Sequence, residues 1–195
     1  MLLLAYSAGA AAVGVFETVD QAVAAARRAF EELGSLSLKK RGEIIKAVRV
    51  MAVERAEDFS RRTVEETKMG RVDHKIAKHI NVARYSPGVE FLTTQAWSGD
   101  HGLSIEEMAP WGVIGAVTPS THPVPTLLNN TICFVASGNT AVFNAHPAGK
   151  KVSAYAVDLV NRAMMAAGAP ANCVTCVAEP TIESAQALFT HQGIN

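Results

Sequence analysis

The chain has 195 residues, of which 49% are hydrophobic and 18% are charged, with 18 basic and 18 acidic side chains. This length and apolar content can bury the core of one large domain, and the composition excludes an intrinsically disordered protein. The formal net charge of zero argues against a nucleic-acid or anionic-membrane surface, because either would need an excess of basic residues.

The first 14 residues, MLLLAYSAGAAAVG, are interpreted as a loose tail. They contain no basic residue, and the apolar run Leu2–Leu4 is short for a secretion signal, although a targeting role stays an alternative. No run of about 18 strongly apolar residues follows, so we expect no membrane span.

Residues 15–95 are predicted to form an N-terminal helical segment. Apolar side chains recur at helical spacing over 19–34, from 37 to about 54, over 56–68 and over 72–85. In the fourth of these helices we expect Ile76, Ile80 and Ala83 to face inward. The four helices are amphipathic, and we interpret them as packing elements.

Residues 96–195 are predicted to form a partial α/β segment. Leu103 and Ile105 alternate with polar residues and predict an edge strand. The apolar runs at 112–117, 140–143 and 173–177 are typical of strands buried on both faces, as in a parallel sheet. Helices are predicted between them at 123–138 and 149–167, and a last helix is capped by Thr181.

This order, β-α-β-α-β-α, predicts an α/β fold in which N-terminal helices precede half of a doubly wound, parallel, Rossmann-like sheet. Ligands of such sheets bind outside the carboxyl ends of the strands. That edge would be formed by the loops 118–123, 144–149 and 179–181. We also expect an unpaired apolar edge beside the third strand, which favours aggregation and poor solubility.

The predicted loops carry polar side chains that suit a nucleotide, namely Ser120, Thr121, His122, Asn144 and His146. A ribose hydrogen-bonded by His146 or Asn144 is one interpretation, and ordinary loop residues fixed by prolines are the other. Neither G-x-G-x-x-G nor G-x-x-x-x-G-K-S/T occurs in the chain, so both standard phosphate-binding motifs are absent.

The cysteines and the remaining histidines give no catalytic or metal-binding pattern. Cys133, Cys173 and Cys176 lie in apolar runs, which is typical of reduced structural thiols. Cys173 and Cys176 have the spacing of a redox pair, but a redox pair starts a helix, and we reject that reading. His74 and His79 are five residues apart and His101 and His191 stand alone, so no metal site is predicted.

One stretch, Glu107–Pro123 (EMAPWGVIGAVTPSTHP), resembles the aldehyde dehydrogenase superfamily. More narrowly, it is similar to the CoA-acylating acetaldehyde and propionaldehyde dehydrogenases of ethanolamine and propanediol utilisation. The resemblance covers about 15–195, and the supporting motifs lie at 65–71, 96–100, 128–132, 136–139, 143–147 and 179–183.

The resemblance implies an oxidoreductase that uses NAD, with CoA as a co-substrate, to convert a small aldehyde into an acyl-CoA. The implied coenzyme-binding residues are Thr118, Pro119, Ser120, Thr121, His122, Asn144, His146, Pro147, Gly149, Glu179 and Pro180. Thr121 aligns with an asparagine that donates to the oxyanion in the wider superfamily, and it is the one catalytic candidate. His146 falls where that superfamily has a lysine on the adenosine ribose.

The resemblance also indicates what the chain lacks. None of its three cysteines stands in the sequence context of the family's nucleophile, so we expect the catalytic domain to be absent and the chain alone to be inactive. The whole enzyme would be a homo-oligomer or would need a complementing chain, in the cytoplasm or in a bacterial microcompartment.

Two alternatives remain. One is a non-catalytic interaction module that docks on full-length subunits or on a microcompartment shell. The other, a non-acylating aldehyde dehydrogenase, is disfavoured because Thr-Pro-Ser-Thr and Asn-Ala-His-Pro replace the motifs of that branch.

Overall fold

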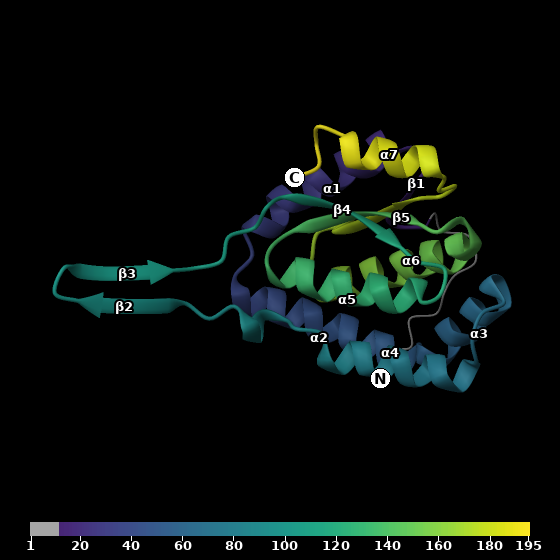
Figure 1. Cartoon of the computed structure of the whole chain (residues 1–195), viewed down its shortest axis with the longest axis horizontal. Helices are drawn as coiled ribbons and strands as arrows, with labels where there is room; N and C mark the ends of the chain where they lie inside the picture. Colours follow the sequence, from purple (N-terminus) through teal and green to yellow (C-terminus); the bar gives the residue numbers. More distant parts are fainter. Residues whose placement is uncertain (1–11) are drawn as a thin grey trace.

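The computed structural model describes residues 12–195 and places a parallel β-sheet between layers of helices (Figure 1). The sheet contains β1 (Val15–Phe16), β6 (Val174–Val177), β5 (Thr140–Ala145) and β4 (Val113–Thr118), in that spatial order. Each neighbouring pair is parallel. The predicted α/β fold is therefore confirmed.

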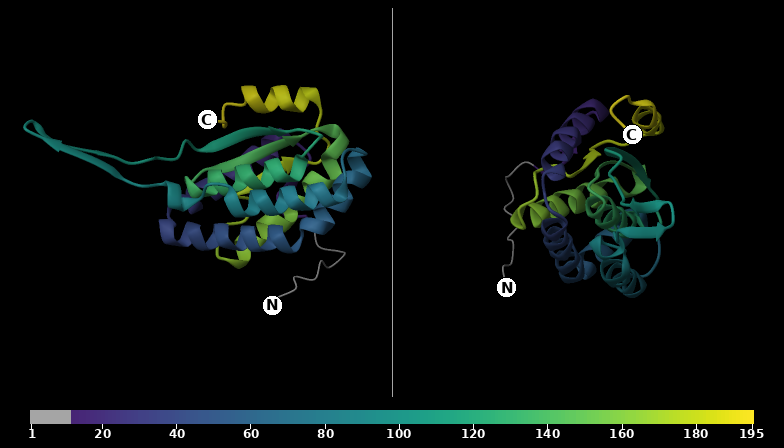
Figure 2. Two further views of the ribbon diagram at one scale, coloured as in Figure 1. Left: turned by 60° about the horizontal axis from the view of Figure 1, so that its bottom comes forward. Right: turned by 90° about the vertical axis from the view of Figure 1, so that its left-hand side faces the viewer.

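Helices cover both faces of the sheet. The crossover helices α5 (Pro123–Ala136) and α6 (Lys150–Ala166) pack on one face, with the short 3-10 helix η2 (Pro147–Gly149) before α6. On the other face lie α1 (Val19–Gly34) and α7 (Ile182–Thr190) (Figure 2). Every residue of β5 and β6 is buried, which explains why these strands read as continuous apolar runs.

A third layer covers α5 and α6. It consists of α2 (Leu38–Glu54), α3 (Ala56–Thr67) and α4 (Val72–Tyr85), followed by the 3-10 helix η1 (Val89–Phe91). The hydrophobic core is shared between this layer, α5, α6 and the sheet. The helical segment therefore supports the elements that carry the sheet's loops.

The prediction of which α4 residues face inward is partly wrong. The structure buries Lys75, His79 and Ala83, whereas Ile76 and Ile80 are only half-buried. Hydrogen bonds make this burial tolerable, because the Lys75 ammonium donates to a backbone carbonyl and the His79 Nδ1 donates to the Lys75 carbonyl oxygen.

The predicted edge strand at Leu103 and Ile105 does not belong to the parallel sheet. It is β3 (Gly102–Glu106), which pairs antiparallel with β2 (Gln95–Gly99) in a separate hairpin. Every residue of the hairpin is exposed, and the hairpin projects far from the body at the amino end of β4 (Figures 1 and 2). The alternation of apolar and polar residues predicted this strand correctly, but it did not predict which strand pairs with it.

The edges of the sheet also differ from the prediction. β1 pairs with β6, so the edge beside the third predicted strand is covered, and the two edge strands are β1 and β4. The Asn195 backbone N–H donates to the Val113 carbonyl of β4 over 3.0 Å.

The end of the predicted tail is anchored. The Val13 N–H donates to an Asp158 carboxylate oxygen over 2.8 Å, and Gly14 adopts a φ of 84° against Val174. A Cβ on Gly14 would lie 2.6 Å from the Val174 carbonyl oxygen, so only glycine fits there. The rest of that tail, residues 1–11, lies outside the described residues. Among residues 12–195, no helix combines the length and the apolar character that crossing a membrane requires.

Candidate functional site

The carboxyl ends of β4 and β5 and one side of α7 line an open cavity of about 550 Å³. Its wall is formed by Val117, Thr118, Pro119, Asn144, Ala145, His146, Pro147, Thr181, Ile182, Ala185, Gln186 and Phe189. The cavity lies at the sheet edge that the topology predicted. The hairpin projects from the opposite end of the sheet (Figure 1).

The pairing of β4 with β5 places His146 at the rim of this cavity. Thr118 is in register with Ala145, and the His146 N–H donates to the Thr118 carbonyl over 3.0 Å. The His146 Nδ1 accepts a hydrogen bond from the Ala148 N–H over 3.1 Å. In the neutral imidazole, Nε2 therefore carries the proton, and this exposed N–H can donate to a ligand.

Asn144 is buried and ties β5 to α7. Its amide nitrogen donates to the Thr181 carbonyl over 3.2 Å, and the Ser184 hydroxyl donates to its amide oxygen over 2.5 Å. Thr181 also caps α7 through Ser184. Because these bonds occupy both ends of the Asn144 amide, the residue shapes the wall of the cavity.

Thr118 borders the cavity at the end of β4, and its side chain lies on the other face of the sheet. Gly115 faces Leu188 of α7, and Asn144, in register with Val117, bonds to α7, so alternation along β4 turns Thr118 towards α5. The residue is 3% exposed, and its Oγ1 has no hydrogen-bond partner among the described residues. A buried hydroxyl without a partner costs about 1–3 kcal/mol.

The predicted site residues Ser120, Thr121 and His122 lie beyond Pro119 in the loop between β4 and α5, outside the cavity wall. The Thr121 hydroxyl lies 2.7 Å from the His122 Nδ1, within hydrogen-bond distance. The His122 pKa is lowered by burial and by the charges of Lys78 and Lys75.

Three further predicted residues lie around the site without lining the cavity. The Glu179 carboxylate pairs with the Lys150 ammonium at the start of α6. Pro180 is buried, and Gly149 packs against Pro123, whose Cγ would lie 3.3 Å from a Cβ on that glycine. These residues connect the loops that carry the cavity.

The apolar wall on α7 was missed by sequence reasoning. Ile182, Ala185 and Phe189 line the cavity, and Ile182 and Phe189 are exposed. The signal was present in the sequence, because Ile182, Ala185 and Phe189 recur at helical spacing beside Leu188, the one buried residue of the helix. An exposed apolar helix face with no partner among the described residues indicates a binding surface.

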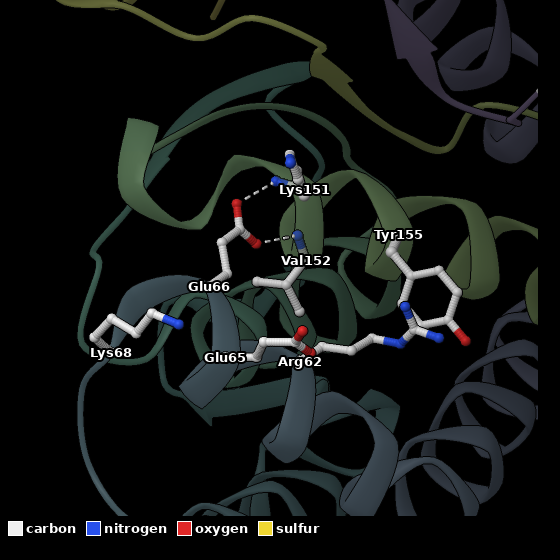
Figure 3. A pocket seen from close by; sticks show the side chains of 7 residues that line it. All are labelled: Arg62, Glu65, Glu66, Lys68, Lys151, Val152 and Tyr155. Carbon is white, nitrogen blue, oxygen red and sulfur yellow. Dashed lines mark hydrogen bonds between the residues drawn. The ribbon is translucent and has the colours of Figure 1, made fainter.

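A second pocket, of about 400 Å³, lies between α3 and α6 and is lined by charged side chains (Figure 3). There, Glu66 accepts the backbone N–H groups of Lys151 and Val152 over 2.8 and 2.7 Å. The Arg62 guanidinium stacks over the Tyr155 ring at 4.2 Å and pairs with Asp58. Glu66 therefore caps the start of α6, and the side chains around this pocket join α6 to α3.

The three cysteines lie outside the cavity and are poor nucleophiles. Burial raises the pKa of Cys173 and of Cys176 to about 12, and it also raises the pKa of Cys133. Thiols with such pKa values stay protonated near neutral pH. The rejection of a redox pair at Cys173 and Cys176 agrees with this burial.

Comparisons with known proteins give a consistent family. A family model described as "Aldehyde dehydrogenase family" matches residues 8–195. The acetaldehyde dehydrogenase (acetylating) EutE of Salmonella typhimurium is 48% identical over 182 residues, which cover 93% of this chain and 38% of that protein.

Solved structures give the same picture. A propionaldehyde dehydrogenase from the Clostridium phytofermentans fucose utilisation bacterial microcompartment is 48% identical with a TM-score of 0.91, covering 93% of this chain and 42% of that one. An engineered glycolyl-CoA reductase with bound NADP+ is 40% identical with a TM-score of 0.91, covering 95% and 43%. The chain therefore spans about two fifths of the length of these relatives.

Proposed function

Because the chain belongs to the aldehyde dehydrogenase family, we propose that it is the coenzyme-binding part of an NAD-dependent, CoA-acylating aldehyde dehydrogenase. The whole enzyme would convert a small aldehyde, CoA and NAD into an acyl-CoA and NADH. The observation that carries the proposal is the cavity at the carboxyl ends of β4 and β5, with the exposed His146 at its rim and an apolar face of α7 in its wall.

The chemistry of the cavity fits a dinucleotide. The apolar surface of Ile182, Ala185 and Phe189 suits the flat face of a base. The His146 Nε2–H suits a ribose hydroxyl group. With the adenosine end against α7, the other end of the molecule would extend over the β4–α5 loop. A bound nicotinamide coenzyme would supply the hydride acceptor, and this chain would hold and orient it.

This part of the enzyme would not catalyse the reaction by itself. The reaction needs a low-pKa thiolate, whereas burial raises the pKa of all three cysteines here. We expect the pure chain to form no NADH from acetaldehyde or propionaldehyde in the presence of CoA and NAD. Formation of NADH that depends on CoA would overturn this part of the proposal.

The exposed hairpin supports an assembled state. Trp97, Leu103 and Ile105 are more than half exposed on this projection, and side chains of this kind gain stability when another chain covers them. A second copy or a complementing chain would fit this surface. The same hairpin is the observation that favours the second candidate function, docking on full-length subunits. We place the whole enzyme in the cytoplasm or within a bacterial microcompartment, in line with the microcompartment relative.

Two matched substitutions test the coenzyme site. Ile182 and Val50 are both exposed apolar side chains on helices, but only Ile182 lines the cavity. Ile182→Ser should weaken NAD binding about fivefold, measured by calorimetry, because apolar contact with the base is lost. Val50→Ser should leave the NAD affinity unchanged. Equal NAD affinities for the Ile182→Ser variant and the unmodified chain would contradict the proposed site.

A further inference from the structure

Lys75 is a buried lysine of α4 that reaches the loop between β4 and α5. The residue is 5% exposed, and its Nζ donates to the Thr121 carbonyl oxygen over 2.7 Å. Among the described residues, no carboxylate lies within ion-pair distance of Lys75. Burial and the charge of Lys78 lower the Lys75 pKa.

A lysine in this position is costly to bury. Lysine is almost never fully buried unless it is paired, and a methionine of similar length would fill the same space without desolvating an amine. The helix does not need the amine for its own hydrogen bonds. Packing within α4 therefore does not explain why this position carries an amine, whereas the hydrogen bond to Thr121 does.

Neighbouring residues aim the Lys75 side chain at the loop. Gly70 has a φ of 77°, and a Cβ there would lie 3.1 Å from the Lys75 Cε, so glycine leaves room for the side chain. A Cβ on Gly70 would also lie 3.6 Å from the Lys75 Nζ. The turn before α4 therefore packs along the end of the side chain, and the bond to Thr121 fixes the amine.

We propose that Lys75 is a positioning residue that holds residues 119–122 of the β4–α5 loop in the conformation that binds the non-adenosine end of the dinucleotide. This inference rests on the proposed coenzyme site. Thr121 is exposed, and its side chain bonds only to the adjacent His122 among the described residues, so the Lys75 contact ties the loop to the helical layer. The fixed carbonyl orients the neighbouring backbone N–H groups and the Thr121 hydroxyl.

The test compares NAD with AMP, which carries only the adenosine end. Lys75→Met removes the hydrogen bond and the charge but keeps the length of the side chain. Lys46→Met is the matched control, because Lys46 is an exposed lysine of α2 outside the layer contact with the loop. By calorimetry, Lys75→Met should weaken NAD binding about tenfold and leave AMP binding unchanged. Lys46→Met should change neither affinity.

Hydrogen exchange provides a readout without nucleotide. Peptides covering 118–126 should exchange severalfold faster in Lys75→Met than in the unmodified chain, and Lys46→Met should match the unmodified chain. If Lys75→Met does not fold, Lys75→Gln replaces it, because glutamine keeps a polar end that is too short to reach Thr121.

The outcomes separate the two proposals. Unchanged NAD affinity in Lys75→Met, or an equal loss of NAD and AMP affinity, overturns the role of Lys75 and leaves the coenzyme site standing. If the unmodified chain binds neither NAD nor AMP, the coenzyme site fails and the role of Lys75 fails with it. Loss of NAD affinity alone, with faster exchange of the loop, supports both.

Discussion

At the scale of single residues, His146 offers the clearest contact for a ligand. Its Nδ1 is occupied by the Ala148 N–H, and its Nε2–H faces solvent at the rim of the cavity. His146→Ala should therefore weaken NAD binding about fivefold, as expected for one lost hydrogen bond. Calorimetry measures the change, with His101→Ala in the hairpin turn as the control. Equal losses in both variants would show that the effect is not local.

His79 makes the stability of the fold depend on pH. Burial lowers its pKa from 6.5 to about 4, so between these values the unfolded chain binds a proton that the folded chain does not. The contribution to stability is full above pH 6.5 and falls as the pH drops towards 4, by up to about 3 kcal/mol at about 1.4 kcal/mol per pKa unit.

Replacing His79 tests this dependence. Urea unfolding of the unmodified chain and of His79→Leu should give free energies that diverge as the pH falls from 7 to 5, with the unmodified chain losing more. His74→Gln, an exposed histidine of the same helix, should follow the unmodified chain. Parallel pH profiles for His79→Leu and the unmodified chain would argue against a neutral, buried His79.

Sequence reasoning could place residues but not their hydrogen bonds. Thr118, Asn144 and His146 were predicted at the site because each ends or follows a buried strand, and parallel strands end at one edge. That the Asn144 amide is fully occupied, or that the Thr118 hydroxyl has no partner, depends on atoms from distant elements. Lys75 was missed because a lysine on an amphipathic helix normally faces solvent.

At the scale of secondary-structure elements, the start of α6 depends on a side chain from α3. No side chain of its own segment caps α6, and the Glu66 carboxylate accepts two of its free N–H groups instead. Glu66→Ala should lower the free energy of unfolding by about 1–2 kcal/mol, because it removes a charged cap at a helix N-terminus. Glu65→Ala, at the adjacent exposed position, should change it by less than about 0.5 kcal/mol in the same urea titration. Equal effects would contradict the capping role.

The elements that the sequence predicted best are those with clear end signals. Thr18 and Ser37 cap α1 and α2, and Thr181 caps α7, each through its own side chain. The strand β1 was missed because two residues carry no periodic signal. The partner of β3 was missed because alternation describes a strand's two faces and not the strand beside it.

At the scale of the whole molecule, the hairpin exposes apolar side chains and the sheet has an edge at β4. The hairpin exposes Trp97, Leu103 and Ile105, and β4 and β1 are the two edge strands of the sheet. Leu103 and Ile105 lie on the same face of the hairpin, because they are two positions apart in one strand. Both features favour association with another chain.

The isolated chain should therefore self-associate as its concentration rises. Light scattering coupled to size exclusion should show a rising mean mass, and the double substitution Leu103→Ser with Ile105→Ser should reduce it. Leu38→Ser, at an exposed leucine of α2 away from the hairpin, is the control. A monodisperse monomer at all concentrations, with cooperative melting above about 60 °C, would contradict this prediction.

The measurement that tests the account most directly is an NMR titration of the isotope-labelled chain with NAD. We expect saturable changes in the backbone amide signals at 117–122, 144–149 and 178–189, because these segments surround the cavity. Signals of the hairpin and of the pocket between α3 and α6 should stay in place. No change up to millimolar NAD, or changes centred on Glu66 and Lys151, would contradict a coenzyme site at the carboxyl edge of the sheet.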